Sequence, residues 1–330
     1  MSNSRQQFPI LPGVFSLPSI AMSRDDMIAF AEAFDPQPFH IDEAAAQATL
    51  LGGLAASAWY TCAKISSSVE AVVSGLGLGA QIAGLDQVLL IAPVRAGDLL
   101  SGKIQLGSAD DCECGNSVCR GRIDIENQRG ESVMRLVLDL FICRSIDQDS
   151  EVPQECKLRK SRQPRARRTA REDVIRHFEE IGIGDEAFLG PYVFDTGKVE
   201  QFGVLTGCGS ETLSQPSDRS FVHVPNWHLP AAWMQCMLQY YKDQSSRFEA
   251  RGMAVPQLGP AAGFKDIRWV RPVRVGETIV FRGWAERKLE IATHRDWGLL
   301  VVGAEGVNAN GDVVVSFCPQ MLIQRAGAAA

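Results

Sequence analysis

The chain has 330 residues, of which 45% are hydrophobic and 22% charged, so it is a globular protein long enough for two domains. A formal net charge of −6 argues against a general nucleic-acid partner, because phosphate affinity needs a basic surface. Neither a signal-peptide run nor an apolar stretch of membrane-spanning length occurs, so we expect a cytoplasmic protein with no membrane partner.

The first predicted helix follows Ser23, which fits an N-cap with Asp26 as its capping-box partner. It should end at Asp35, because Pro36 disfavours helical ψ in the residue before it. Its apolar face carries Met27, Phe30, Ala31 and Phe34.

The connector after this helix, DPQPFH, runs from Asp35 to His40 around two prolines. Pro36 and Pro38 fix φ and favour extended backbone before them, so the connector should be stiff and hold both polar side chains in a fixed relation. A neutral imidazole and a carboxylate held in this way can share one water and add it to a polarised double bond, or remove it. Alternatively, Asp35 caps a helix end and His40 packs at the base of the next helix, although Asp42 already supplies the cap there.

A longer apolar helix is predicted from Gly52 to Val73, since no charged residue occurs before Lys64. A counterpart begins at Leu229, where the phrase AWMQC overlays AWYTC of the first helix. Both helices should be largely buried.

Between and after these helices the sequence repeats itself. One repeated segment is LDQVLLIAPVRAGDLL, at 85–100, which matches KDIRWVRPVRVGETIV, at 265–280. The residues of the PxRxG phrase in the two segments are separated by a constant offset of 179. ENQRGESVM, from 126, is matched by VNANGDVVV, from 307, at an offset of 181. The chain therefore reads as a tandem duplication of one α+β unit, a helical stretch followed by three or four β runs. Each unit should be an antiparallel sheet wrapped around a central helix, and two units could join edge to edge.

The basic stretch CKLRKSRQPRARRTAR, at 156–171, separates the two copies. We expect a catalytic unit at 1–150, a basic linker at 151–172 and a second unit at 173–330. Such a run is typical of a solvated linker, and the alternative is a docking site for the phosphates of a nucleotide-bearing substrate.

The nine cysteines are scattered without a CxxC pair, which predicts reduced thiols. The densest group, Cys112, Cys114 and Cys119, lacks a fourth ligand and the usual spacing of a zinc site. We therefore expect no metal, and SGLGLGAQ at 74–81 lacks the third glycine of a dinucleotide loop, so we expect no cofactor.

The phrases FAEAFDPQPFHIDEAAAQATLLGGLAASAWYT, PVRAGDLL and NQRGESVM resemble the MaoC-like hydratase family, the (R)-specific enoyl-CoA hydratases and 3-hydroxyacyl thioester dehydratases with the hotdog fold. The resemblance runs through about residues 8–144 and continues in the second half only in the strands. It implies a double hotdog in which Asp35 and His40 are the catalytic pair that activates water.

The resemblance also implies substrate-binding residues near the start of the buried helix. A backbone N–H of Ala58, or of its neighbour Ser57, is expected to stabilise the thioester enolate, although the family usually has glycine where Ala58 stands. Gly53 belongs to the same GGLxAS phrase, and Ser66 falls where many family members carry a polar residue near the water.

The second copy has lost the motif, because the alignment places Gly207 on Asp35 and Thr212 on His40. We therefore expect one active site per chain, with the second half shaping the substrate pocket. The expected wall residues are Trp227, His228 and Trp233. Read as metal ligands, His223 and His228 lack a third partner.

The leading hypothesis is a lyase that adds water to a trans-2-enoyl thioester of CoA or an acyl carrier, giving an (R)-3-hydroxyacyl thioester, or the reverse, in fatty acid metabolism. Two alternatives remain open, a hotdog acyl thioesterase and a non-catalytic acyl-binding subunit. Addition of a substrate hydroxyl to the enoyl thioester would use the same residues. The chain should act as a monomer or pair as a homodimer.

Overall fold

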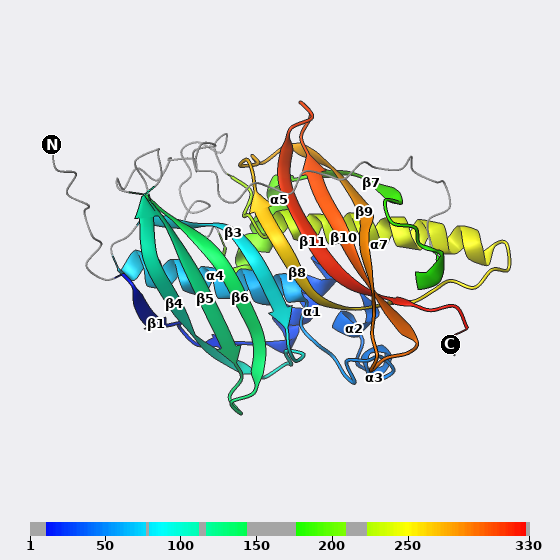
Figure 1. Cartoon of the computed structure of the whole chain (residues 1–330), viewed down its shortest axis with the longest axis horizontal. Helices are drawn as coiled ribbons and strands as arrows, with labels where there is room; N and C mark the ends of the chain where they lie inside the picture. The colour runs from blue at the N-terminus through cyan, green and yellow to red at the C-terminus, as the bar shows by residue number, and fades with distance from the viewer. Residues whose placement is uncertain (1–10, 77–78, 112–116, 144–175, 209–222, 328–330) are drawn as a thin grey trace.

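The computed structural model describes residues 11–76, 79–111, 117–143, 176–208 and 223–327. One long antiparallel sheet dominates the molecule (Figure 1), with the strand order β1-β4-β5-β6-β3-β8-β11-β10-β9-β7 and β2 paired to β4. The first half supplies β1 (Gly13–Ser16), β2 (Ile20–Ala21), β3 (Gly79–Leu90), β4 (Leu99–Asp111), β5 (Ser117–Glu126) and β6 (Ser132–Cys143). The second half supplies β7 (Glu186–Val193), β8 (Leu258–Trp269), β9 (Thr278–Glu290), β10 (Trp297–Val307) and β11 (Val313–Gln324).

The two halves join where β3 pairs with β8, so their two antiparallel sheets form one continuous sheet. Val88 lies opposite Phe264 in this pairing, and Leu85 lies opposite Ile267. On the other face of the junction the Arg268 guanidinium donates to the Asp86 carboxylate at 2.5 Å and to the backbone carbonyl of Leu85 at 2.9 Å. The predicted edge-to-edge joining of two antiparallel units is therefore confirmed.

The duplication predicted from the repeated phrases is visible in the turns. Asn127 accepts hydrogen bonds from the backbone N–H groups of Arg129 and Glu131 in the β5–β6 turn. Asn308 accepts from the N–H groups at 310 and 312 in the β10–β11 turn, and both turns contain a glycine at positive φ, at 130 and 311. The same side-chain chemistry thus builds the same turn twice.

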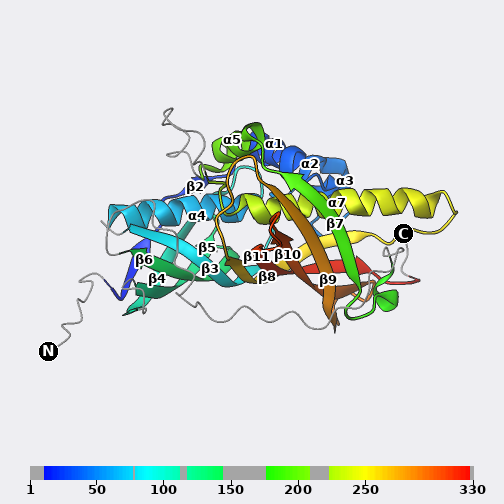
Figure 2. The same ribbon diagram turned by 90° about the horizontal axis from the view of Figure 1, so that it is seen from above.

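The helices form two further layers above one face of the sheet (Figure 2). The long helices α4 (Ala58–Gly75) and α7 (His228–Glu249) lie across the sheet. Four shorter helices lie on the far side of them, namely α1 (Arg24–Phe34), α2 (Pro38–Ile41), α3 (Glu43–Gln47) and α5 (Thr196–Thr206), and a single 3-10 turn, η1 (Phe178–Glu180), precedes β7. Among the described residues, none of these helices has the length and apolar character to cross a membrane.

Helix α1 follows the sequence prediction closely. The Ser23 hydroxyl accepts from the N–H of Asp26 at 3.4 Å, and the helix ends at Phe34 with Asp35 as its C-cap. Its predicted apolar face is buried against α5, where the Phe34 and Phe202 rings lie 5.3 Å apart. The helix is thereby fixed immediately before the connector that carries Asp35.

Helix α4 begins at Ala58 rather than at the predicted Gly52. Gly52 and Gly53 have φ values of 58° and 140°, which a helix does not allow, so the small residues before Ser57 form an extended approach segment instead. Ser57 is the true N-cap, since its hydroxyl accepts from the N–H of Trp59 at 3.2 Å.

Candidate active site

The structure brings Asp35 and His40 together. His40 Nε2 lies 3.4 Å from the Asp35 Oδ2 atom, and the two residues are only 7% and 2% exposed. His40 Nδ1 lies 2.7 Å from the backbone carbonyl of Ala55, which can only accept, so Nδ1 carries the proton. In a neutral ring this leaves the Nε2 lone pair directed to the side where Asp35 lies.

The local backbone explains this placement. Gln37 is extended, with ψ at 139°, as expected before a proline. Pro38 then serves as the first residue of the one-turn helix α2, where proline is favoured because its missing N–H needs no partner. His40 therefore projects from a one-turn helix that begins at the second proline of the connector. Asp42 caps α3 as predicted, accepting from the N–H of Ala45 at 2.7 Å.

Both oxygens of Asp35 are held by buried donors. The Ser57 hydroxyl donates to Oδ2 at 2.7 Å, and the Gln37 side-chain amide donates to Oδ1 at 2.9 Å. Ser57 is fully buried and Gln37 is 9% exposed. Ser57 therefore contacts the Asp35 carboxylate through its hydroxyl and does not itself line the cavity that contains Asp35. Gln37 was missed, although its position between Asp35 and His40 was the signal that could have found it.

Arg95, from the repeated PVRAGD phrase, fixes the approach segment to α4. Its guanidinium donates to the carbonyls of Leu51, Gly53 and Leu54, the last two at 2.5 and 2.9 Å. Gly53 thus contributes a backbone carbonyl to this clamp. It does not line the cavity that contains Asp35. The N–H of Ala56 also bonds the carbonyl of Val94 at 2.9 Å, so the segment before Ser57 is tied to the β3–β4 turn.

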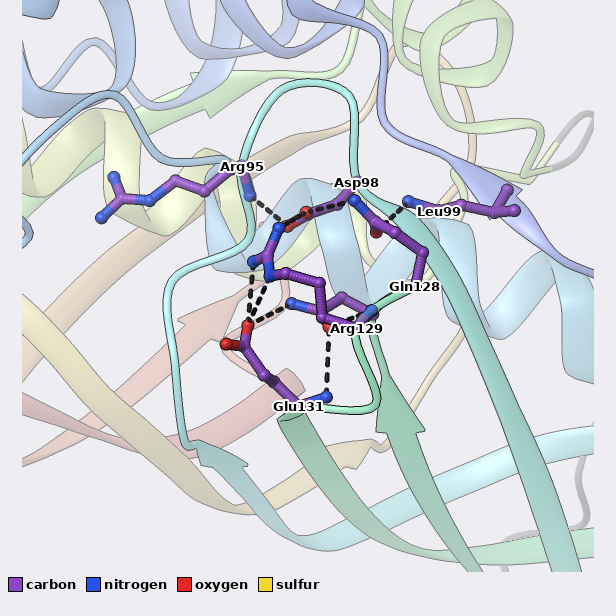
Figure 3. A network of polar contacts seen from close by, with 7 residues as sticks. Arg95, Asp98, Leu99, Gln128, Arg129 and Glu131 are labelled. Atoms are coloured by element: carbon purple, nitrogen blue, oxygen red, sulfur yellow. Dashed lines mark hydrogen bonds and ion pairs between the residues drawn. The ribbon is translucent and has the colours of Figure 1, made fainter.

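A second polar network holds that turn (Figure 3). The buried Asp98 carboxylate accepts from the backbone N–H of Arg95 at 2.8 Å and lies 3.6 Å from the Arg129 guanidinium. Gln128 accepts from the N–H of Leu99 at 2.9 Å, which links the β4 start to the β5–β6 turn. As Figure 3 shows, the Arg95 side chain points away from this network, which frees its guanidinium for the approach segment.

Asp35 and His40 open onto a cavity of about 190 Å³ formed by both halves of the chain. Ala58, Trp59 and Thr61 reach it from the first turn of α4. Its remaining wall is mostly apolar, and the second half contributes Met234, Pro260, Ala261, Ala262, Phe264 and Leu322. Trp59 and Phe264 stack at 4.0 Å, so the halves are in direct contact at this wall.

Ser66 lies elsewhere. It is buried, accepts from the Trp227 indole N–H at 2.6 Å, and lines a separate, more polar cavity of about 620 Å³ together with Trp227. Thr61, not Ser66, is the α4 residue with a hydroxyl side chain that lines the site cavity. The Thr61 hydroxyl donates to the carbonyl of Ser57 at 3.1 Å.

The other expected wall residues do not line the cavity that contains Asp35. His228 is fully buried in an aromatic cluster, stacked on Phe202 at 4.7 Å and within 3.1 Å of the Tyr192 hydroxyl. Burial lowers its pKa to about 3, so it is neutral. Trp233 lines a third cavity and donates to the carbonyl of Arg282 at 3.1 Å. His228 therefore packs in the core, and Trp233 borders the neighbouring cavity beneath α7 instead of the cavity that contains Asp35.

Several predicted features lie outside the described residues, namely Cys112, Cys114, Thr212 and the linker at 151–172. Cys119 is buried, and burial raises the pKa of its thiol to about 11, so it behaves as a protonated core residue. At the position aligned with Asp35, Gly207 caps α5 at a φ of 79° and offers no side chain.

Residues 13–127 match the family described as a MaoC like domain, which covers the approach segment and the Asp35–His40 pair. The first half of the chain therefore contains a MaoC-like domain. Its likeness to solved structures extends over both halves: a putative MaoC domain protein dehydratase from Chloroflexus aurantiacus is 14% identical, with a TM-score of 0.70 and 96% of each chain covered.

A conserved hypothetical protein from Mycobacterium tuberculosis, described as having a double hotdog fold, is also 14% identical, with a TM-score of 0.62 over 94% of this chain and 96% of that one. A MaoC-like dehydratase from Rhodospirillum rubrum is 33% identical over 41% of this chain and 92% of that one, with a TM-score of 0.37. No curated protein matches the chain. The fold is a double hotdog, and the MaoC-like match lies in the half that carries Asp35 and His40.

Proposed function

We propose that this MaoC-like protein is a hydro-lyase that adds water to a trans-2-enoyl thioester, giving an (R)-3-hydroxyacyl thioester, or catalyses the reverse dehydration. The observation that carries the proposal is the buried Asp35–His40 pair, 3.4 Å apart, at the head of a mostly apolar cavity. An apolar cavity with a few convergent polar groups suits an acyl chain whose reactive end meets an acid–base pair.

In the proposed hydration, His40 Nε2 accepts a proton from water while the water oxygen bonds to C3 of the substrate. Asp35 accepts a hydrogen bond from the same water and stabilises the imidazolium that forms. The imidazolium then returns the proton to C2, so water is added with no proton left over. The hydrogen bond from Nδ1–H to the Ala55 carbonyl keeps Nε2 free to accept and return the proton in both hydration and dehydration.

The negative charge that develops on the thioester oxygen needs a donor. Ala58 is the first residue of α4 and lines the cavity, and the first N–H groups of a helix have no partner within it. We assign the Ala58 N–H to the thioester oxygen, assisted by the positive end of the helix dipole. The Ser57 hydroxyl is assigned to positioning Asp35 instead.

The residues that line the cavity suggest a different role for each half of the chain. We propose that residues 1–150 supply catalysis and that 173–330 supply the acyl-chain side of the pocket, joined by the linker at 151–172. Met234 and Phe264 are examples of second-half side chains that line the cavity while Asp35 and His40 come from the first half. CoA and an acyl carrier protein are both compatible carriers.

The test is a panel of trans-2-enoyl and 3-hydroxyacyl thioesters, with loss of the enoyl absorbance, thiol release and product chirality recorded together. A hydratase removes the enoyl absorbance without releasing thiol, whereas a thioesterase releases thiol. Asp35→Asn and His40→Gln should each lower kcat by roughly a thousandfold or more, and non-additively. Thiol release by the wild type, or a wild-type hydration rate in both variants, would exclude the proposed lyase.

A further inference from the structure

A further apolar cavity lies beneath α7 in the second half. Its volume is about 120 Å³, and its lining includes Trp233, Met237, Leu258, Leu300, Val302 and Met321. Arg176 and Asp185 also border it, and they are paired with each other at 3.4 Å. A cavity so lined accepts an apolar ligand, because it leaves a polar substituent without partners.

This cavity and the site cavity are separated by a thin wall. Met234 lines the site cavity, and Met237, one helical turn further along α7, lines the cavity beneath the helix. On the sheet side, Ala261 of β8 lines the site cavity and is the register partner of Met321 of β11, which lines the other. Both cavities therefore follow the same helix and the same strand pair.

Much of the wall is methionine, the most adaptable apolar side chain. Met234, Met237 and Met321 are all buried, and an unbranched thioether with three rotatable bonds can change its shape without leaving the core. A substrate chain can therefore pass between the cavities if these side chains change rotamer, without movement of α7 or the sheet.

We propose that the cavity beneath α7 receives the far end of the acyl chain and that Met237 sets the preferred chain length. This inference rests on the proposed function, because it takes Asp35 and His40 as the fixed thioester end. The chain then runs away from the catalytic half toward Met234, which faces it from α7.

The volumes define the substrate class. Cavities of about 150 Å³ lined by Leu, Ile and Phe hold a ligand as large as benzene. By that measure the site cavity holds the thioester end and the first few carbons, and the cavity beneath α7 adds roughly four to six more. The substrate is therefore a linear, unsubstituted acyl chain of medium length rather than a short one.

The experiment measures kcat/KM for trans-2-enoyl-CoA thioesters from butenoyl to dodecenoyl with the full-length protein. In the wild type, kcat/KM should rise from butenoyl to the medium-length thioesters. Met237→Trp fills the cavity beneath α7 and should lower the dodecenoyl-to-butenoyl ratio of kcat/KM at least roughly tenfold, the effect of losing even one methylene contact. Met237→Ala enlarges the cavity and should shift the optimum to longer chains. Met253→Trp is the matched control, because Met253 is 49% exposed and lies in the turn after α7.

The outcomes separate the two proposals. If the wild type hydrates no enoyl thioester, the proposed function fails. If it hydrates butenoyl-CoA but loses activity at every longer chain, the acyl chain does not reach beneath α7 and the inference is overturned. It is equally overturned if longer chains are accepted and neither Met237 variant changes the ratio. Met237→Ala removes volume where Met237→Trp adds it, so either variant tests the assignment if the other fails to fold.

Discussion

Replacing Ser57 with alanine tests the proposed positioning of Asp35. The Ser57 hydroxyl donates to Asp35 Oδ2 at 2.7 Å with both residues buried, so Ser57→Ala removes one of the two donors that hold the carboxylate. A hydrogen bond to a charged group contributes about 1.5–3 kcal/mol, and each 1.4 kcal/mol is a factor of ten. We therefore expect kcat/KM to fall by roughly 10- to 150-fold.

The assay is enoyl thioester hydration over a range of substrate concentrations, together with thermal unfolding. Losing the N-cap should also lower the unfolding free energy by about 1 kcal/mol, so stability alone does not distinguish the roles. The split between kcat and KM does, because Asp35 is assigned to the reacting water and not to the acyl chain, so kcat should fall with little change in KM. Ser66→Ala is the matched control, since it removes a buried serine of the same helix whose hydroxyl bonds Trp227 away from the site. The reasoning is refuted if Ser57→Ala and Ser66→Ala have the same kcat.

Three further predictions concern stability. His228 has a folded pKa of about 3, below the usual value near 6.5. Its contribution to the unfolding free energy is therefore complete above pH 6.5 and is lost as pH falls toward 3, with about 2 kcal/mol lost between pH 6.5 and 5. His228→Phe should flatten this part of a plot of unfolding free energy against pH. A wild-type slope unchanged by that substitution would contradict the assignment. Arg95→Met should lower the unfolding free energy by about 2 kcal/mol and reduce kcat, because three backbone carbonyls before α4 lose their donor. A variant with normal kcat would show that catalysis does not depend on these hydrogen bonds. Arg268→Met should lower the unfolding free energy in urea denaturation by about 2 kcal/mol by breaking its pair with Asp86 at the β3–β8 junction, while Asp86 keeps its second partner Arg120. A loss below about 0.5 kcal/mol would mean that the pair does not stabilise the junction.

The parts of the fold that were predictable are those in which local chemistry repeats. The offsets of 179 and 181 placed the strands of both halves, because the strand and turn residues were copied together. The end of α1 at Asp35 followed from one proline, and the cap of α3 followed from Asp42.

The start of α4 was not predictable from its composition. GGLAASA is apolar and small, which suits a buried helix, but Gly52 and Gly53 adopt positive φ because Arg95 binds the carbonyls around them. That contact joins residues more than forty positions apart, and no local pattern contains it. Whether Thr61 or Ser66 lines the site cavity likewise depends on the packing of α4, which no local pattern contains.

In the candidate site, too, a contact within one short segment was predictable and contacts between distant segments were not. The spacing of Asp35 and His40 indicated that they belong together, because both lie on one short connector. The Ser57 hydroxyl on Asp35 depends on where α4 meets that connector, and the site wall depends on how β8 joins β3. Trp233 and His228 were misplaced because the sequence pattern of α7 does not reveal which of its side chains border which cavity.

The shared wall of the site cavity has a consequence for how such a protein changes over evolutionary time. Met234 and Phe264 border the substrate without belonging to the half that carries the acid–base pair. Mutations can therefore accumulate in one copy of the duplicated gene and alter what is accepted, while the reaction itself stays under separate selection in the other copy.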